Sequence, residues 1–327
     1  MLSLLTTLRD PPLTMGTADV EINVVNRSDF QPLSFVRHIL ASASAFDGLV
    51  LDGSVGARGW YSDLLAAGFL TRRHECPPIV IADCTWKRGH GWIDRSACRA
   101  GIGFVDDPRI TYCVLSTREL DMFPRTWKVE SRRVRFTPWP YTIDESELSR
   151  PISDTGGVFS GGDSLRDYRS LLQICGSLPT PVTVATRLQP PRGFSPPGNL
   201  TLGPVAHDRF MECMRRATVV VVPIQAGLER SAGQQTYLNA MALGKPVVVT
   251  DTLGVTDYVE DGRTGLIVPP GDAAALRGAL EWVLDEANRE AVQTMGERAK
   301  DAARKRFTPT RYANSLLEIV KSAVDHR

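Results

Sequence analysis

The sequence lacks an excess of either charge. Its 38 lysines and arginines face 37 aspartates and glutamates, which leaves a formal net charge of +1. A balanced chain has no bulk attraction to nucleic acid or to an anionic membrane, so we expect no nucleic-acid partner. The chain also lacks an apolar run of about 18 residues, the length that a membrane-spanning helix requires. These absences, with 43% hydrophobic and 23% charged residues, predict a globular protein.

Cysteine is sparse, and no CxxC pair occurs. The six cysteines are scattered along the chain, at Cys76, Cys84, Cys98, Cys113, Cys175 and Cys213. Three of them (Cys84, Cys113 and Cys175) lie in or beside apolar runs, as buried thiols do. The pattern indicates a reducing compartment and argues against a zinc cluster.

The first residues, "MLSLLTTLRDPPLTMG", lack the basic segment that opens a signal peptide, and their apolar stretch is short. We therefore predict a cytoplasmic location. A weak amphipathic contact at the inner face of the membrane is the alternative left open.

In the second half of the chain, apolar runs alternate with helical patterns. The strand candidates are nearly continuous apolar runs, as in a parallel sheet covered on both faces. We predict a doubly wound α/β domain there. The strands are "GGVFSGG", "PVTVAT", "GNLTLG", "TVVVVPI", "PVVVTD" and "GLIVPP". The helices are "SLRDYRSLLQICGSL", "AHDRFMECMRRA", one within "ERSAGQQTYLNAMALG", and "DAAALRGALEWVLDE", the last with Asp272 as its N-cap.

The first half shows the same alternation more faintly. No GxGxxG follows its strand "INVVN", which disfavours an ordinary nicotinamide enzyme. A stretch rich in proline, serine and acidic residues, "TPWPYTIDESELSRPISDTGG", predicts a linker. We predict one domain over residues 1–145, joined by a final helix at 309–327, and a second over residues 146–308. In such sheets ligands bind beyond the carboxyl ends of the strands, so the site is expected in the loops there, across a cleft.

The first candidate loop is "SGGDSLRDY". Gly161 and Gly162 end a strand, and Ser164 or Asp163 is placed to cap the next helix. Helix-start amides together with the charge of Arg166 would suit a phosphate or pyrophosphate. The alternative is a tight turn with an ordinary cap and Arg166 on the surface.

The second candidate is the polar start of "ERSAGQQTYLNAMALGKPVVVTD". Amide and hydroxyl side chains at a helix start would hold phosphate and sugar hydroxyls, because asparagine and glutamine both donate and accept. The alternative is the solvated face of an ordinary helix. The residues concerned are Ser231, Gly233, Gln234, Gln235, Thr236 and Asn239.

A third polar loop, "ADCTWKRGHGW", follows a strand in the first half. Asp83 and His90 are candidates for acid–base catalysis there. For a lone histidine, an exposed loop position without a catalytic role is the alternative.

The segment "NAMALGKPVVVTDTLGVTDYVEDGRTGLIVPPGDAAAL" (residues 239–276) resembles the C-terminal domain of GT-B glycosyltransferases of the family-four, or group 1, retaining kind. The resemblance extends more weakly over residues 157–306. It implies two Rossmann-like domains facing a cleft, with a C-terminal helix that crosses back to the first domain. It also implies that the C-terminal domain binds a nucleotide-sugar donor.

Carried onto this sequence, the resemblance places the glycine loop with Arg166 at the diphosphate and the backbone at Val205 at the base. The family has two glutamates eight residues apart, where this chain has Ser231 and Asn239. Asn239 retains the ability to bind a ribose. The sugar contact at Ser231 is altered, and Glu229 is the nearby acidic candidate for it.

The activity implied is transfer of a sugar from a nucleoside-diphosphate sugar to an acceptor hydroxyl of a glycan, lipid or small molecule, with retention of configuration. No cofactor or metal is expected. Two alternatives remain open: a catalytically degenerate GT-B protein that binds nucleotide-sugar or acts as a scaffold subunit, and a nucleotide-sugar hydrolase or epimerase on the same fold.

Overall fold

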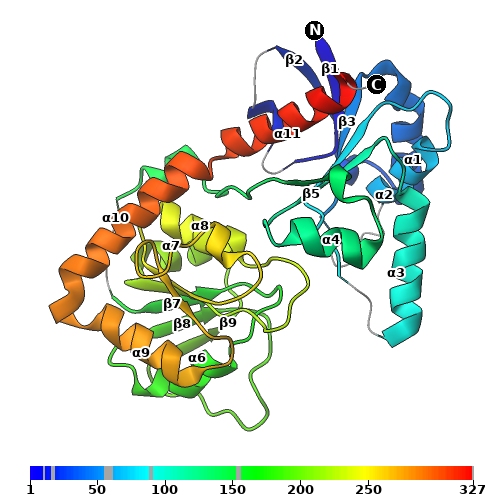
Figure 1. The fold of residues 1–327 in the computed structure, drawn as a ribbon. Helices are drawn as coiled ribbons and strands as arrows, with labels where there is room; N and C mark the ends of the chain where they lie inside the picture. The colour runs from blue at the N-terminus through cyan, green and yellow to red at the C-terminus, as the bar shows by residue number, and fades with distance from the viewer. Residues whose placement is uncertain (10–11, 16–18, 55–61, 88–90, 152–155, 326–327) are drawn as a thin grey trace. The chain divides into compact units, whose positions relative to one another are not determined.

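The computed structural model describes residues 1–9, 12–15, 19–54, 62–87, 91–151 and 156–325 of the 327-residue chain. The chain divides into two units (Figure 1). Unit 1 comprises Met1–Trp139 and Pro309–Arg327, and unit 2 comprises Pro140–Thr308. This division falls six residues before the predicted boundary between residues 145 and 146.

Unit 1 is built on a six-stranded parallel sheet of order β2-β1-β3-β4-β5-β6. The strands are β1 (Leu2–Thr6), β2 (Val20–Val24), β3 (Gly48–Asp52), β4 (Ile79–Ala82), β5 (Ile110–Val114) and β6 (Val134–Phe136). The main helices are α1 (Pro32–Ser42), α2 (Ser62–Leu70), α3 (Gly91–Val105), α4 (Glu119–Trp127) and α11 (Pro309–Asp325).

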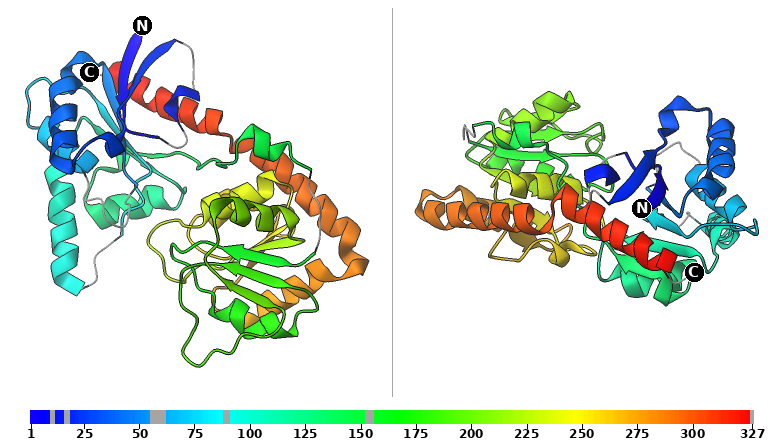
Figure 2. Two further views of the ribbon diagram at one scale, coloured as in Figure 1. Left: turned by 180° about the vertical axis from the view of Figure 1, so that it is seen from behind. Right: turned by 90° about the horizontal axis from the view of Figure 1, so that it is seen from above.

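The two faces of this sheet pack against different helices, because successive strand residues point to opposite sides. Leu49 and Leu51 of β3 belong to the core cluster that includes residues of α1 and α2. Val50, between them, packs in a second cluster with Leu316 and Val320 of α11. The final helix, which follows unit 2 in the chain, therefore completes unit 1, as predicted (Figure 2).

Unit 2 has a second six-stranded parallel sheet, of order β12-β11-β10-β7-β8-β9. Its strands are β7 (Val158–Gly161), β8 (Val182–Ala185), β9 (Leu200–Gly203), β10 (Val219–Val222), β11 (Val247–Thr250) and β12 (Leu266–Val268). The helices are α5 (Glu145–Leu148), α6 (Arg169–Ile174), α7 (His207–Arg216), α8 (Gln234–Ala242), α9 (Ala273–Leu284) and α10 (Arg289–Arg306). The predicted cap of α9 is confirmed, since the Asp272 carboxylate accepts hydrogen bonds from the backbone N–H groups of Ala274 and Ala275.

The strand order of unit 2 contains a topological switch point. From β7 the chain adds β8 and β9 on one side, then returns to add β10, β11 and β12 on the other. The loops after β7 and β10 therefore leave adjacent strands in opposite directions, which opens a crevice at their carboxyl ends. The predicted doubly wound α/β class is confirmed for both sheets. Within the described residues, no helix has both the length and the apolarity to cross a membrane.

Candidate functional site

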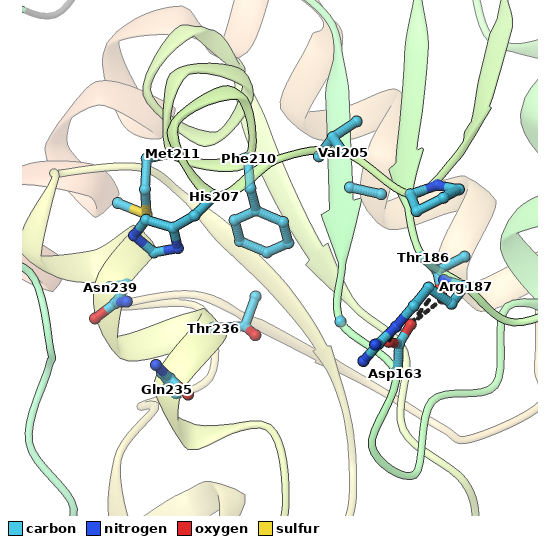
Figure 3. A pocket seen from close by; sticks show the side chains of 13 residues that line it. Asp163, Thr186, Arg187, Val205, His207, Phe210, Met211, Gln235, Thr236 and Asn239 are labelled. Atoms are coloured by element: carbon cyan, nitrogen blue, oxygen red, sulfur yellow. Dashed lines mark hydrogen bonds and ion pairs between the residues drawn. The ribbon is translucent and has the colours of Figure 1, made fainter. Parts of the chain in front are cut away.

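A pocket of about 430 Å³ lies at the carboxyl edge of the unit 2 sheet (Figure 3). The turn after β7, the loops after β8 and β9, helix α7 and the first turns of α8 form its walls. The described residues that line it are Gly162, Asp163, Ala185, Thr186, Arg187, Pro204, Val205, His207, Phe210, Met211, Gln235, Thr236 and Asn239. Five residues predicted for the donor site are thus brought together in the lining: Gly162, Val205, Gln235, Thr236 and Asn239.

Two glycines stand where β7 ends and the next turn begins. A Cβ on Gly161 would lie 2.3 Å from Cε2 of Phe210, and Gly162 has a φ of +101°, which favours glycine. The prediction that a helix starts at Asp163 or Ser164 is wrong, because α6 begins only at Arg169. A turn, and not the start of a helix, therefore borders the pocket on this side.

Arg166 is buried and not a surface cation. Its Nε donates to the Gly161 carbonyl (3.2 Å), Nη1 to the Ser164 carbonyl (3.0 Å) and Nη2 to Oγ1 of Thr236 (2.9 Å). Burial lowers the pKa of its guanidinium. Arg166 ties the glycine turn to α8 and is absent from the described pocket lining.

The start of α8 supplies the opposite wall of the pocket. Gly233 precedes the helix with a φ of +88°, and no side chain caps the helix. Of the polar residues predicted here, Ser231, Gln234, Thr236 and Asn239 are buried, whereas Gln235 is exposed. The alternative of a solvated polar face is therefore excluded for those four. Ser231, 1% exposed, is absent from the described pocket lining.

Thr142 fixes the carboxamide of Asn239. The Thr142 backbone N–H donates to Oδ1 of Asn239 (2.8 Å), while Nδ2 of Asn239 donates to the Thr142 hydroxyl (3.1 Å). Nε2 of Gln235 donates to the same hydroxyl (3.1 Å). These contacts turn the carbonyl oxygen of Asn239 toward Thr142.

A polar cluster at the end of β8 was not predicted from the sequence. Oδ1 of Asp163 accepts hydrogen bonds from the Thr186 hydroxyl (2.7 Å) and the Arg187 backbone N–H (2.8 Å), and Oδ2 accepts from Nε of Arg187 (2.7 Å). Although partial burial favours the neutral acid, these hydrogen bonds lower the pKa of Asp163. The signal was present in the sequence, because Thr186 is the last residue of the predicted strand "PVTVAT" and Arg187 directly follows it.

Three further pocket residues were also missed. His207, Phe210 and Met211 come from the first turns of α7, and Figure 3 shows their side chains at the pocket. They follow Val205 closely in the chain, and their helical spacing places them along one face of α7.

Of the predicted catalytic residues, Asp83 and Glu229 are not among the described residues that line this pocket. Asp83, at the end of β4 in unit 1, is buried with a φ of +54° and accepts a hydrogen bond from the Tyr312 hydroxyl (2.6 Å). Burial raises the pKa of Asp83 to about 8. Glu229 is exposed and outside the pocket lining, and His90 lies outside the described residues.

Metal ligands do not gather in the described part of the chain. Among those residues, no group of three or more histidine, cysteine, aspartate or glutamate side chains is placed to hold a metal ion. The described cysteines are all free thiols.

Part of unit 2 is similar in sequence to known glycosyltransferases. Residues 167–286 match the model of the family "Glycosyl transferases group 1". An 82-residue segment is 39% identical to D-inositol 3-phosphate glycosyltransferase of Acidothermus cellulolyticus and covers 25% of this chain and 17% of that protein. An 84-residue segment is 31% identical to an alpha-1,3/1,6-mannosyltransferase of Neurospora crassa and covers 26% of this chain and 18% of the relative. The matched segments thus span less than a fifth of these two relatives.

Solved structures match the whole chain in fold. The sucrose-phosphate synthase of Thermosynechococcus elongatus aligns with a TM-score of 0.70 at 14% identity and full coverage of both chains. Anabaena Alr3699/HepE, in complex with UDP, aligns with a TM-score of 0.67 at 16% identity, covering 98% of this chain and 100% of that one. The chain therefore has the GT-B fold, and the resemblance to group 1 glycosyltransferases is confirmed.

Proposed function

We propose that this chain is a glycosyltransferase that moves a sugar from a nucleoside-diphosphate sugar to an acceptor hydroxyl. The observation that carries the proposal is the pocket at the switch point of unit 2, formed between the glycine turn after β7 and the start of α8. Its volume of about 430 Å³ is in the range of small-molecule sites. The family match covers most of the elements that build it.

The phosphates of the donor are assigned to the space between Gly162 and the first turn of α8. The first amides of a helix have no acceptor within the helix, and its dipole makes that end positive. Gly162 presents backbone without a side chain, so an anion can approach closely. Arg166 serves this site indirectly, by holding the turn and Thr236 in place.

The nucleoside is assigned to the other end of the pocket. Asn239 is the candidate for the ribose hydroxyls, because it lines the pocket and its Nδ2 carries two hydrogens, of which one donates to Thr142. Val205 and the ring of Phe210 form the wall at which the base would pack, because aromatic rings stack favourably on flat partners.

The names of the structural neighbours guide the choice of donor. Anabaena Alr3699/HepE is recorded in complex with UDP-glucose, at a TM-score of 0.68 and 14% identity to this chain. UDP-glucose and other UDP-sugars are therefore the first donors to test.

In the proposed reaction, the bond between the sugar and the diphosphate breaks as the acceptor hydroxyl attacks. The leaving diphosphate gains negative charge, which the amides at the start of α8 would stabilise. Retention of configuration, catalysis without a metal, and a cytoplasmic location with peripheral membrane contact all remain predictions. Asp83 has no part in the proposal because it is buried beneath Tyr312, while His90 and Glu229 remain candidates.

Two measurements test the proposal. Thermal unfolding with UDP, GDP, ADP and dTDP should reveal at least one nucleotide that raises the melting temperature, because a ligand that binds the folded state stabilises it. Release of free nucleoside diphosphate from the matching sugar donors, with a panel of acceptor hydroxyls, then measures transfer. If none of the four nucleotides binds, the proposal fails.

The second candidate is a degenerate protein that binds the donor without turnover. Ser231 and Asn239 favour it, because they occupy the positions where the family carries glutamate. Nucleotide binding without transfer to any acceptor, combined with a gain of transfer in the Ser231→Glu variant, would establish this reading.

A further inference from the structure

The donor pocket contains an arginine that the family resemblance does not point to. A cation stabilises a bound anionic diphosphate, and Arg166 is the residue predicted from the sequence for that role. The structure buries Arg166 behind the glycine turn, with its guanidinium bonded to two carbonyls and a hydroxyl. Among the described residues that line the pocket, Arg187 is the single lysine or arginine.

The guanidinium of Arg187 is oriented by Asp163. The Asp163 carboxylate is itself held, since Oδ1 accepts hydrogen bonds from the Thr186 hydroxyl and the Arg187 backbone N–H. Its other oxygen, Oδ2, accepts from Nε of Arg187 at 2.7 Å. The two residues therefore form a cyclic contact that fixes both ends of the arginine side chain.

This contact uses only the Nε side of the guanidinium. Within the described part of the chain, no hydrogen bond engages the terminal nitrogens Nη1 and Nη2 of Arg187. The side chain is 81% exposed, so a ligand can reach those nitrogens. A planar guanidinium with two free nitrogens matches the bidentate geometry of a phosphate group.

The position of the pair suits a contact with the phosphates. Asp163 and Thr186 follow the two neighbouring strands β7 and β8, and Figure 3 shows the Asp163–Arg187 pair at one side of the pocket, with Gln235 and Asn239 at the other. Gly162, which precedes Asp163 in the pocket lining, has no side chain that could block a ligand from reaching the pair.

We propose that Arg187 is the cationic diphosphate-binding residue of this pocket and that Asp163 is its positioning residue. This inference rests on the proposed function. Positive charge thus reaches the donor from the loop after β8 and not from the glycine turn. Asp163 acts through Arg187. Its carboxylate would repel a bound phosphate if the Arg187 guanidinium did not neutralise it.

Binding of UDP and of uridine to the full chain, measured by calorimetry, tests this role. GDP, ADP or dTDP with its own nucleoside replaces UDP if thermal unfolding shows that nucleotide to bind instead. We expect Arg187→Ala to weaken diphosphate binding by about tenfold or more, the effect of losing a charge-assisted hydrogen bond. The nucleoside, which has no phosphate, should bind the variant and the wild type equally.

Two further variants test whether the loss comes from the Arg187 contact with the diphosphate or from any loss of positive charge in this loop. Arg192→Ala removes an exposed arginine of the same loop that lines a different pocket, so it should leave diphosphate affinity unchanged. Asp163→Asn should weaken diphosphate binding in the wild type and have no further effect in the Arg187→Ala background, because residues that act as one unit are not additive.

The outcomes distinguish this inference from the proposed function. Unchanged diphosphate affinity in Arg187→Ala overturns the inference while the donor site stands. An equal loss for the nucleoside, or an equal loss in Arg192→Ala, also overturns it. An additional loss from Asp163→Asn in the Arg187→Ala background removes Asp163 from its positioning role. If the wild type binds none of the four nucleotides, the proposed function itself fails.

Discussion

At the scale of single residues, two arginines near one pocket have opposite roles because their burial differs. Arg166 is 7% exposed and satisfies carbonyl oxygens of its own turn, whereas the Arg187 side chain is 81% exposed. Sequence alone identifies both as cations near strand ends. It does not reveal which one folds back beneath the chain, because that depends on the left-handed backbone at Leu165, with a φ of +56°.

Arg166→Met should destabilise unit 2. The change removes three hydrogen bonds and leaves the Gly161 carbonyl and the Thr236 hydroxyl without this partner, at a cost of about 1–3 kcal/mol. Urea unfolding measures the loss. Arg169→Ala, an exposed position at the start of α6, is the control and should change stability little. Equal stability of Arg166→Met and the wild type would contradict the structural role.

Asn239→Ala should weaken nucleoside-diphosphate binding by about 1 kcal/mol, the net value of a typical hydrogen bond. If Asn239 contacts the ribose, as proposed, the loss should vanish for a 2′,3′-dideoxy nucleoside diphosphate, which has no hydroxyls to bind. Calorimetry with both ligands gives the comparison. A loss of the same size for the dideoxy ligand would mean that the variant acts through its contact with Thr142 instead.

At the scale of elements, strand prediction succeeded where apolar runs were long. The runs around β10 and β11 are continuous valine, which marks them as buried on both faces. The start of α6 was predicted too early, because Ser164 and Asp163 look like ordinary caps. In the structure Asp163 bonds to the loop after β8, and Arg166 forms an isolated bridge to Ile224. A tertiary contact thus overrides a local capping signal.

Gly48→Ala should destabilise unit 1 by about 1–3 kcal/mol, the usual cost of overpacking. An added Cβ at the start of β3 would lie 2.8 Å from Cγ2 of Val320 on α11 and 3.2 Å from Cδ2 of Leu4. Thermal or urea unfolding measures the effect.

Gly101→Ala is the matched control for this change. Gly101 lies within α3, and nothing lies within 4 Å of an added Cβ. Alanine favours a helix interior over glycine, so this variant should be neutral or more stable by up to about 1 kcal/mol. Destabilisation by Gly101→Ala equal to that by Gly48→Ala would refute the packing argument.

At the scale of the whole molecule, the fold class was predictable because strand and helix periodicities repeat along both halves. The polar wall of the pocket at α8 was also predictable, since its polar residues follow a buried strand. The Asp163–Arg187 pair and the contact of Thr142 with Asn239 were not predicted. Each joins residues far apart in sequence, 24 and 97 positions respectively, and no local pattern records such contacts.

Stability should fall as the pH rises from about 4 to about 8, through the carboxyl group of Asp83. Its pKa in the folded protein is raised to about 8 from an ordinary 3.8, mainly by burial. The folded state therefore holds a proton that the unfolded chain releases in this interval, so raising the pH favours unfolding. Below pH 4 the contribution is fully present, and above pH 8 it is lost.

Urea unfolding of the wild type and of Asp83→Asn, measured between pH 5 and 8, checks this dependence. Asparagine stays neutral, accepts the Tyr312 hydrogen bond and tolerates a positive φ, so the variant should lose less stability as the pH rises. Burial also raises the pKa of Asp63. Because Asp63 is present in both proteins, its contribution to the pH dependence cancels in the comparison. Parallel pH profiles would show that Asp83 does not titrate in this range.

The packing of α11 against unit 1 has a consequence for synthesis. A ribosome makes β1, β3 and β4 first, then all of unit 2, and only then α11. Until that helix emerges, Leu4, Val50 and Val80 lack their contacts with Leu316, Leu317 and Val320 of α11. Domains generally fold as units in the order of synthesis. Here the first unit begun is the last one finished, and its nascent apolar face must be kept from aggregation while unit 2 is translated.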